Sequence, residues 1–253
     1  MRNASLFWGG ILVLLGVLML FGAIQYFWPI VLIVIGVWIV AGAYLRGSAK
    51  SETVSVDLQA ARDVSLKINH GAGRLQVGAG ASLGKALEGE CAEGVRVDSR
   101  LSGDRLEVRL RGDPVVIPFI GWNARSLDWN LRLSQEIPFT LDFEMGANQS
   151  SIDLRDVRVS SLRLQTGASS TDLILPAAGQ VTARVQMGAA ELKITVPQGV
   201  AARIRSQSGL AEINVDRGRF PFVNGVYESP DFGASPNRVD LMIEAGVGKV
   251  TVW

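Results

Sequence analysis

Hydrophobic and polar residues alternate along most of the chain after about residue 60. The stretch "LRLQTGASSTDLILP" begins at Leu162, and the similar stretch "ARVQMGAAELKITVP" begins at Ala183. Alternation with a period of two is typical of β-strands with one buried face, because successive side chains point to opposite sides. The pattern therefore predicts a repeated unit in which two strands flank a turn.

A glycine marks the turn of each unit. Four of these glycines follow one another at intervals of 21 residues, and two more sit in the same local pattern at larger separations. The six are Gly71, Gly146, Gly167, Gly188, Gly209 and Gly246. We expect them to be structural turn residues, since glycine adopts backbone angles that strain other residues.

A repeat of this length predicts a solenoid, in which stacked units share one core. In a β-helix each unit is one coil and neighbouring coils pair in parallel, whereas in a meander each unit is a hairpin and the pairing is antiparallel. Tight hairpins favour Asn-Gly or Asp-Gly turns, but these turns read "TGASS", "MGAAE" and "SGLAE". The sequence favours a β-helix domain over residues 51–253, and a meander is the alternative.

Two regions of this domain depart from the repeat. Residues 78–136 are expected to form irregular coils and an excursion at one end of the solenoid. Residues 216–237 form an inserted loop between Gly209 and Gly246. Insertions in solenoids map to loops, often on a binding face, so the loop either caps the open end of the core or binds a partner. Its aromatic residues are the candidates for both roles, and capping is the preferred interpretation: Phe220, Phe222, Tyr227 and Phe232.

The first 50 residues have a different pattern, with two long apolar runs and no acidic residue. The runs extend over residues 6–24 and 27–45 without a charge, and each has 19 residues. A helix needs roughly 20 residues to cross the hydrocarbon core of a bilayer. We therefore expect residues 1–50 to form a transmembrane helical hairpin. A cleaved signal peptide fits less well because the second run follows at once, and a buried soluble hairpin would show a polar face.

Three cations flank the two runs on the same side: Arg2, Arg46 and Lys50. The positive-inside rule places such residues in the cytoplasm. The β domain is therefore expected on the cytoplasmic side of a bacterial inner membrane, with the lipid bilayer as a partner.

Composition and motifs give little indication of chemistry. The chain carries 25 Lys+Arg and 24 Asp+Glu, so it has no basic excess that would favour nucleic acid. Its single histidine, His70, occupies a position that other units fill with Met145 or Thr166, which indicates a structural role. Cys91 is the single cysteine, and no phosphate loop, zinc spacing or nucleophile elbow occurs. We expect no catalytic residue, metal or cofactor.

At family level, "LFWGGILVLLGVLMLF" with "FWPIVLIVIGVWIV" resembles the membrane region of LiaI- and LiaF-type bacterial proteins. The segment "LDWNLRLSQEIPFTLDFEMGANQSSIDLRDVRVSSLRLQTGASSTDLILP" and the ending "GVYESPDFGASPNRVDLMIEAGVGKVTVW" resemble the toastrack domain of LiaF-type proteins and of many bacterial adhesins. The resemblance implies a right-handed β-helix without catalytic residues.

The same resemblance implies a non-enzymatic interaction module in the cell-envelope stress response, where LiaF-type members restrain a membrane sensor kinase. LiaF-type regulators often have four membrane helices where this chain is expected to have two, so the kinase partnership does not follow directly. Two alternatives are a self-assembling scaffold of stacked β-helices, which would make the chain a homo-oligomer, and a surface adhesin of inverted topology.

Overall fold

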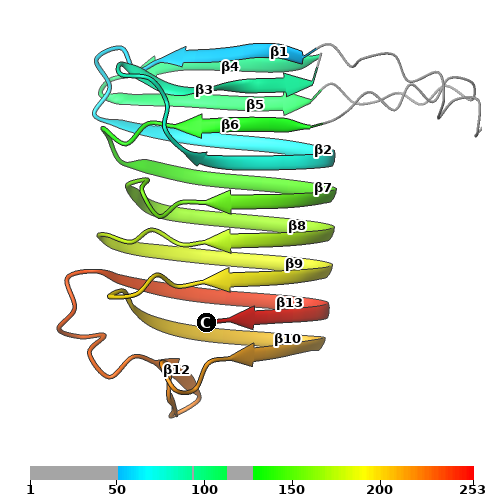
Figure 1. Ribbon diagram of the computed structural model, residues 1–253, viewed down its shortest axis with the longest axis vertical. Coiled ribbons are helices and arrows are strands. Elements are labelled where there is room, and N and C mark those ends of the chain that lie inside the picture. Colours follow the sequence, from blue (N-terminus) through cyan, green and yellow to red (C-terminus); the bar gives the residue numbers. More distant parts are fainter. Residues whose placement is uncertain (1–50, 93, 113–127) are drawn as a thin grey trace, which may run out of the picture. The chain divides into compact units, whose positions relative to one another are not determined.

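The computed structural model describes residues 51–92, 94–112 and 128–253, which belong to one compact unit built of β-strands (Figure 1). Within these ranges it contains no helix. The strands are β1 (Ser51–Asp57), β2 (Asp63–Ala79), β3 (Lys85–Ala92), β4 (Val95–Ser102), β5 (Arg105–Gly112), β6 (Trp129–Leu133), β7 (Phe139–Asp153), β8 (Val159–Ile174), β9 (Gln180–Thr195), β10 (Ala201–Val215), β11 (Phe222–Val223), β12 (Val226–Glu228) and β13 (Arg238–Val252).

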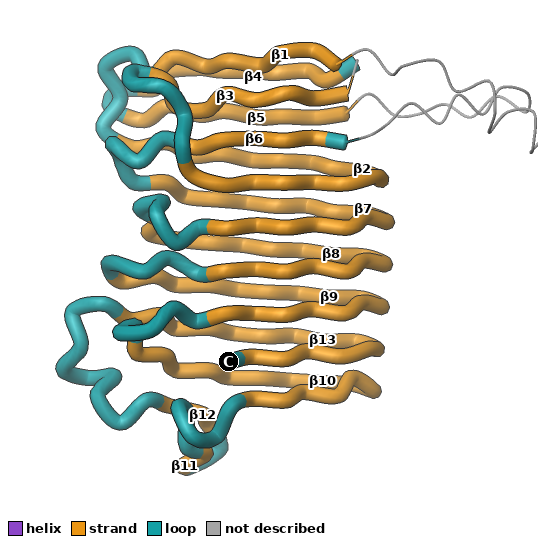
Figure 2. Tube along the Cα trace, in the orientation of Figure 1, coloured by secondary structure: helices purple, strands orange, loops and turns teal. Residues whose placement is uncertain are grey.

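The six longest strands are the coils of a solenoid (Figure 2). Each of them bends at its repeat glycine, so that its first half lies in one layer and its second half in the other. Neighbouring coils pair in parallel, with Leu162 of β8 opposite Ala183 of β9 and Ala183 opposite Leu241 of β13. The β part of the expected fold agrees with this arrangement, and the antiparallel meander is wrong for these coils. Apolar side chains alternate inward and fill a continuous core between the layers.

The order of the coils differs from their order along the chain. It runs β2, β7, β8, β9, β13, β10, so the last strand of the chain lies inside the stack. Inward side chains explain the order: those of β13 are apolar and almost completely buried, whereas β10 has Ser206 and Ser208 at the corresponding positions. At an end of the stack, one side of a strand faces water. A strand with fewer apolar residues therefore loses less free energy of burial there.

The opposite end of the stack is built from shorter strands. β5 and β6 both pair in parallel with β2, one in each layer, and so take the place of one more coil. Beyond them the pairing becomes antiparallel, with β4 on β5, β3 on β6 and β1 on β3. The described part of residues 78–136 is therefore regular, whereas irregular coils were expected.

The expected helical hairpin over residues 6–24 and 27–45 lies outside the described residues, as do Arg2, Arg46 and Lys50. A search of the described ranges finds no helix long and apolar enough to cross a membrane. The expected fold class, a transmembrane helical hairpin followed by a β-helix, is therefore corrected to all-β for the residues that the structure describes. The described chain is all-β, because its apolar residues recur with the period of two that builds strands.

The repeat glycines form a column at one corner of the solenoid, in the order Gly71, Gly146, Gly167, Gly188, Gly246, Gly209. None of these six has a positive φ, so the expected reason for glycine, an unusual backbone angle, is wrong. The reason is close approach between coils. A Cβ on Gly146 would lie 2.3 Å from the carbonyl oxygen of Gly71, and one on Gly246 would lie 2.6 Å from that of Gly188.

Replacing Gly146 by alanine should destabilise the domain, because the new Cβ meets a backbone oxygen that cannot move aside. We expect a loss of about 1–3 kcal/mol, as in other overpacked sites. Gly71→Ala is the matched control, since a Cβ there meets nothing within 4 Å. It should leave stability unchanged or raise it slightly. Chemical denaturation measures both, and equal losses would show that contact at the corner is not the constraint.

The alternation within β9 gives a second prediction. Ile194 is fully buried and the neighbouring Lys193 is exposed. Ile194→Ala should lower the free energy of unfolding by roughly 2–5 kcal/mol, as a buried large-to-small change does. Lys193→Ala should change it by about 0.5 kcal/mol or less. Similar losses for the two variants in urea denaturation would contradict this strand register.

Candidate functional site

The candidate interaction site lies at the outermost coil, β10. The two halves of this strand have different surroundings. β12 pairs antiparallel with the first half, placing Glu228 opposite Arg203 and Tyr227 opposite Ile204. The second half, residues 210–215, pairs with β13, and the described residues provide no strand on its other side. One layer of the stack is thus extended by a hairpin, and the other ends at β10.

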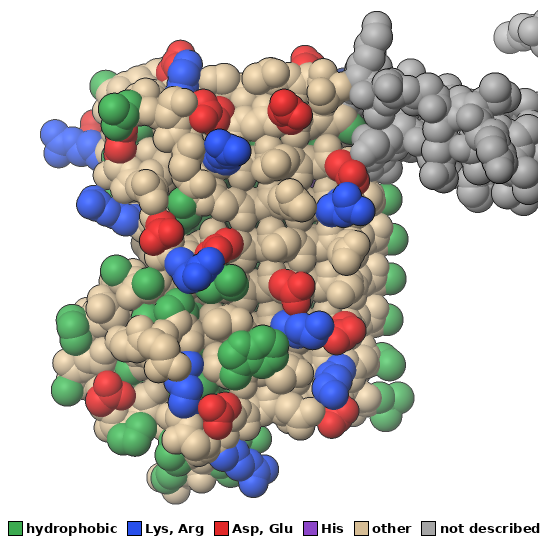
Figure 3. Space-filling view, viewed as in Figure 1, with side chains coloured by type: hydrophobic (Ala, Val, Ile, Leu, Met, Phe, Trp, Pro, Cys, Tyr) green, Lys and Arg blue, Asp and Glu red, His purple; other side chains and the backbone are tan. Residues whose placement is uncertain are grey.

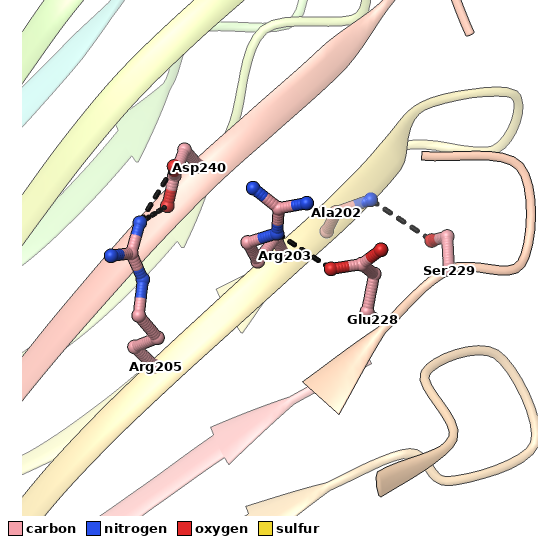
Figure 4. A network of polar contacts seen from close by, with 6 residues as sticks. All are labelled: Ala202, Arg203, Arg205, Glu228, Ser229 and Asp240. Atoms are coloured by element: carbon pink, nitrogen blue, oxygen red, sulfur yellow. Dashed lines mark hydrogen bonds and ion pairs between the residues drawn. The ribbon is translucent and has the colours of Figure 1, made fainter. Parts of the chain in front are cut away.

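Polar contacts attach the inserted loop to the first half of β10 (Figure 4). The backbone nitrogen of Ala202 donates to Ser229 Oγ, and the nitrogen of Ser229 donates to the Ala202 oxygen, both at 2.9 Å. Arg203 Nε donates to Glu228 Oε2 at 2.5 Å. This hydrogen bond raises the pKa of Arg203, so its guanidinium group stays charged. The contacts fix the loop as part of the folded domain.

The structure divides the four aromatic residues of the loop between two environments. Phe220 is fully buried in the core, and Phe232 is buried beneath the guanidinium group of Arg203, 4.3 Å from its ring centre. Tyr227 is half-buried against the core. Phe222 is 53% exposed and rests on Tyr227, with 4.6 Å between the ring centres. Phe220 and Tyr227 thus pack on the core, Phe232 is buried beside Arg203, and Phe222 faces solvent.

Phe222 belongs to a protruding hairpin, β11–β12, that sequence reasoning missed. Val223 beside it is 58% exposed. The hairpin turns at Asn224 and Gly225, whose φ angles of 53° and 83° are those of a tight hairpin turn. "VNGV" is the Asn-Gly signal that the repeat turns lack, so the sequence contained the information needed to find this hairpin.

The second half of β10 leaves the core partly open. Ile213 and Val215 point toward the interior but are only half-buried, whereas Ile194 and Val252, in the same row as Val215, are fully buried. Leu210, just after the corner, is 84% exposed. Figure 3 shows hydrophobic side chains following the corner edge of the solenoid toward this end. Apolar surface and an unpaired strand edge therefore lie together here.

A second surface feature, a groove of about 890 Å³, follows the glycine column. The repeat glycines line it, together with the side chains two positions before each of them: Asn69, Glu144, Gln165, Gln186, Gln207 and Glu244. Several of these side chains bond to one another from coil to coil. Gln165 Nε2 donates to Gln186 Oε1 at 2.7 Å, and Gln186 Nε2 donates to Glu244 Oε2 at 2.6 Å. This ladder stabilises the stack and leaves fewer groups for a ligand.

His70 and Cys91 both lie in structural surroundings. His70 is buried, with Nδ1 3.1 Å from the amide nitrogen of Asn148 and its ring edge-on to Trp129. Burial raises the pKa of the Cys91 thiol to about 12, with a smaller contribution from Glu52, so the thiol stays protonated at neutral pH. Over the ranges that the structure describes, no group of three His, Cys, Asp or Glu side chains could hold a metal ion.

Comparison with known proteins identifies the family. Residues 45–195 match the family described as the N-terminal domain of toast_rack, DUF2154. This is more than half of the chain. The chain belongs to the toastrack family. The match confirms the toastrack part of the resemblance, whereas the LiaI- and LiaF-type part stays a prediction. No curated protein matches the chain.

One solved structure supports the fold. A candidate cell adhesion protein from Clostridium sporogenes is 20% identical, with a TM-score of 0.73 over 81% of this chain and 98% of that one. A candidate adhesin from Bacteroides fragilis (10% identical, TM-score 0.33, covering 81% and 97%) and a candidate lipid binding protein from Parabacteroides distasonis (9%, 0.22, 82% and 97%) are more distant. Only the Clostridium sporogenes structure is similar enough to support an argument, and at 20% identity it shows the fold alone.

The division of the aromatic residues predicts losses of stability of very different size for Phe220 and Phe222. Phe220→Ala should cost about 3–5 kcal/mol of stability, because it leaves a cavity in the core. Phe222→Ala removes an exposed ring and should cost at most about 1 kcal/mol. Thermal unfolding followed by circular dichroism distinguishes the two. A large loss in the Phe222 variant would show that this ring also belongs to the cap.

Proposed function

We propose that this toastrack domain is a non-enzymatic interaction module of the bacterial cell-envelope stress response, and that it binds another envelope protein through the exposed part of its outer end. A membrane sensor kinase is the proposed class of partner. The proposed location is the cytoplasmic side of the cell membrane, and its support is the charge pattern of residues 1–50, which contain cations but no acidic residue.

The observation that carries the proposal is the exposed apolar pair on the β11–β12 hairpin. Phe222 and Val223 stand on a support that is itself buried and hydrogen-bonded, through Tyr227 and Ser229. Exposed aromatic residues on a rigid support are common centres of protein interfaces, because their burial contributes much free energy at little entropic cost. A cap that served stability alone would gain nothing from an outward Phe222.

The test is recovery of the partner from bacterial cells that express the tagged full-length chain. After mild detergent extraction, the wild-type chain should bring down a sensor kinase or another stress regulator. A variant with Phe222→Ser and Val223→Ser should lose that protein while keeping its melting temperature. Val247→Ser is the matched control, because Val247 is also apolar and exposed but lies on the corner edge.

Three results would contradict the proposal. Recovery of further copies of this chain alone would favour the self-assembling scaffold. Equal recovery by the hairpin variant and by the control would remove the hairpin from the interface. An unchanged envelope-stress reporter in cells that lack the protein would separate it from that response.

A further inference from the structure

We infer that the second half of β10 is a docking edge for one extended peptide segment of a partner protein, in which apolar residues alternate with a central lysine or arginine. The inference rests on the proposed function and specifies how such a partner would bind. It is argued from the backbone, the interior, the surface charges and the shape of this end of the solenoid.

The backbone of residues 211–215 has hydrogen-bonding groups directed away from the stack. The nitrogen of Asp216 donates to the Val252 oxygen on β13 at 2.9 Å. In a parallel ladder, alternate residues direct both of their backbone groups to the same side. Ala211, Ile213 and Val215 therefore direct their N–H and C=O groups to the outer side, where the described part of the chain supplies no partner strand. A strand added here would pair with these groups.

The rows of inward side chains end at β10, and a strand added beside β10 would need an apolar residue to continue each of them. Leu192, Val250 and Ile213 form one inward row across β9, β13 and β10, and Ile194, Val252 and Val215 form the next. The members on β9 and β13 are fully buried, and those on β10 are half-buried. An apolar side chain at the end of each row would complete the burial that the inner coils already have.

The outward row on the other side of the Ile213 row, between Ala211 and Ile213, requires a cation. Glu191, Lys249 and Glu212 lie side by side on β9, β13 and β10, so the sign of the charge alternates from coil to coil. Opposite charges on neighbouring strands stabilise a sheet, and like charges destabilise it. A lysine or arginine beside Glu212 continues the alternation. The row therefore selects a cation flanked by two apolar residues, one beside Ala211 and one beside Ile213.

The cap decides between a single peptide and a second copy of the solenoid. A second copy would bring both of its layers against this end, and the first layer of this end already holds β12 beside Arg203 and Ile204. A single peptide needs the width of one strand in the other layer, where the stack ends at β10. In the same layer at the opposite end, the edge strand β1 is less suited, because its Val54 and Val56 are already buried.

The ordinary alternative is that Glu212 merely protects an edge strand from aggregation, as charged residues on edges often do. The two interpretations differ in whether a peptide binds. The probe is a capped, fluorescent nine-residue peptide in which threonine and valine alternate and the central residue, at a threonine position, is lysine. The purified full-length chain should bind it saturably in fluorescence anisotropy.

Two variants of the edge test the mode of binding. Val215→Pro removes an outward N–H that the fold does not use, so the melting temperature should hold while affinity falls by about tenfold or more. Glu212→Lys should weaken the lysine peptide and strengthen a matched peptide with central glutamate. Glu191→Lys is the control, because Glu191 lies on the same row two strands from the edge. It should change affinity by less than about twofold.

Absence of saturable binding to the wild-type chain would overturn the inference, as would equal affinity of a folded Val215→Pro variant. If that variant fails to fold, the charge exchange at Glu212 decides alone, and an unchanged peptide preference overturns the inference. Recovery of the envelope partner from cells tests the proposed function separately from the docking edge. If Val215→Pro still recovers the partner, the interaction module stands and the docking edge does not.

Discussion

Close approach between neighbouring corner backbones determines the geometry of this domain. At Gly146 and Gly246 the chain passes so near a carbonyl oxygen of the neighbouring coil that a side-chain carbon would overlap with it, and at Gly167, Gly188 and Gly209 that carbon would be in tight contact. Because every coil turns at the same place, both halves of the coil pair at once, and inward side chains fall into continuous rows. The buried rows, the outer amide ladder and the unfinished rows at β10 all follow from this alignment.

Strands and their buried faces could be predicted from the sequence, but not the order of the strands. Alternation shows which side of a strand faces the core, and the 21-residue interval shows which positions correspond. Neither shows which coil is the neighbour, because β10 and β13 share the same alternation and the same turn glycine. Ser206 and Ser208 marked β10 as the weaker strand, and their significance becomes clear only once β10 is seen at the end of the stack. Which half of β10 has an unpaired edge could likewise not be predicted from the sequence.

The inserted loop shows a similar limit. Its position and its aromatic content were evident, yet Phe220 and Phe222 are only two residues apart and have opposite environments. The intervening Pro221 and the Asn-Gly turn set the direction in which each ring points, and this depends on where β12 meets β10. Burial of a loop residue is decided by the surface that the loop covers, so local sequence alone could not assign it. The glycine column was found from the sequence, but its reason was found only from contacts between coils.

The place of β13 has a consequence for how the domain is made. Strands of a solenoid can join the stack as they leave the ribosome, each on the one before. Here β9 cannot gain its final neighbour until residues 238–252 have been synthesised, well after β10, because that neighbour is β13. Before then, β10 offers β9 the same glycine spacing and a similar row of side chains. Completion of the fold therefore requires that any early contact between β9 and β10 open again to admit β13. A protein cut short before residue 238 loses an inner coil and not an outer one.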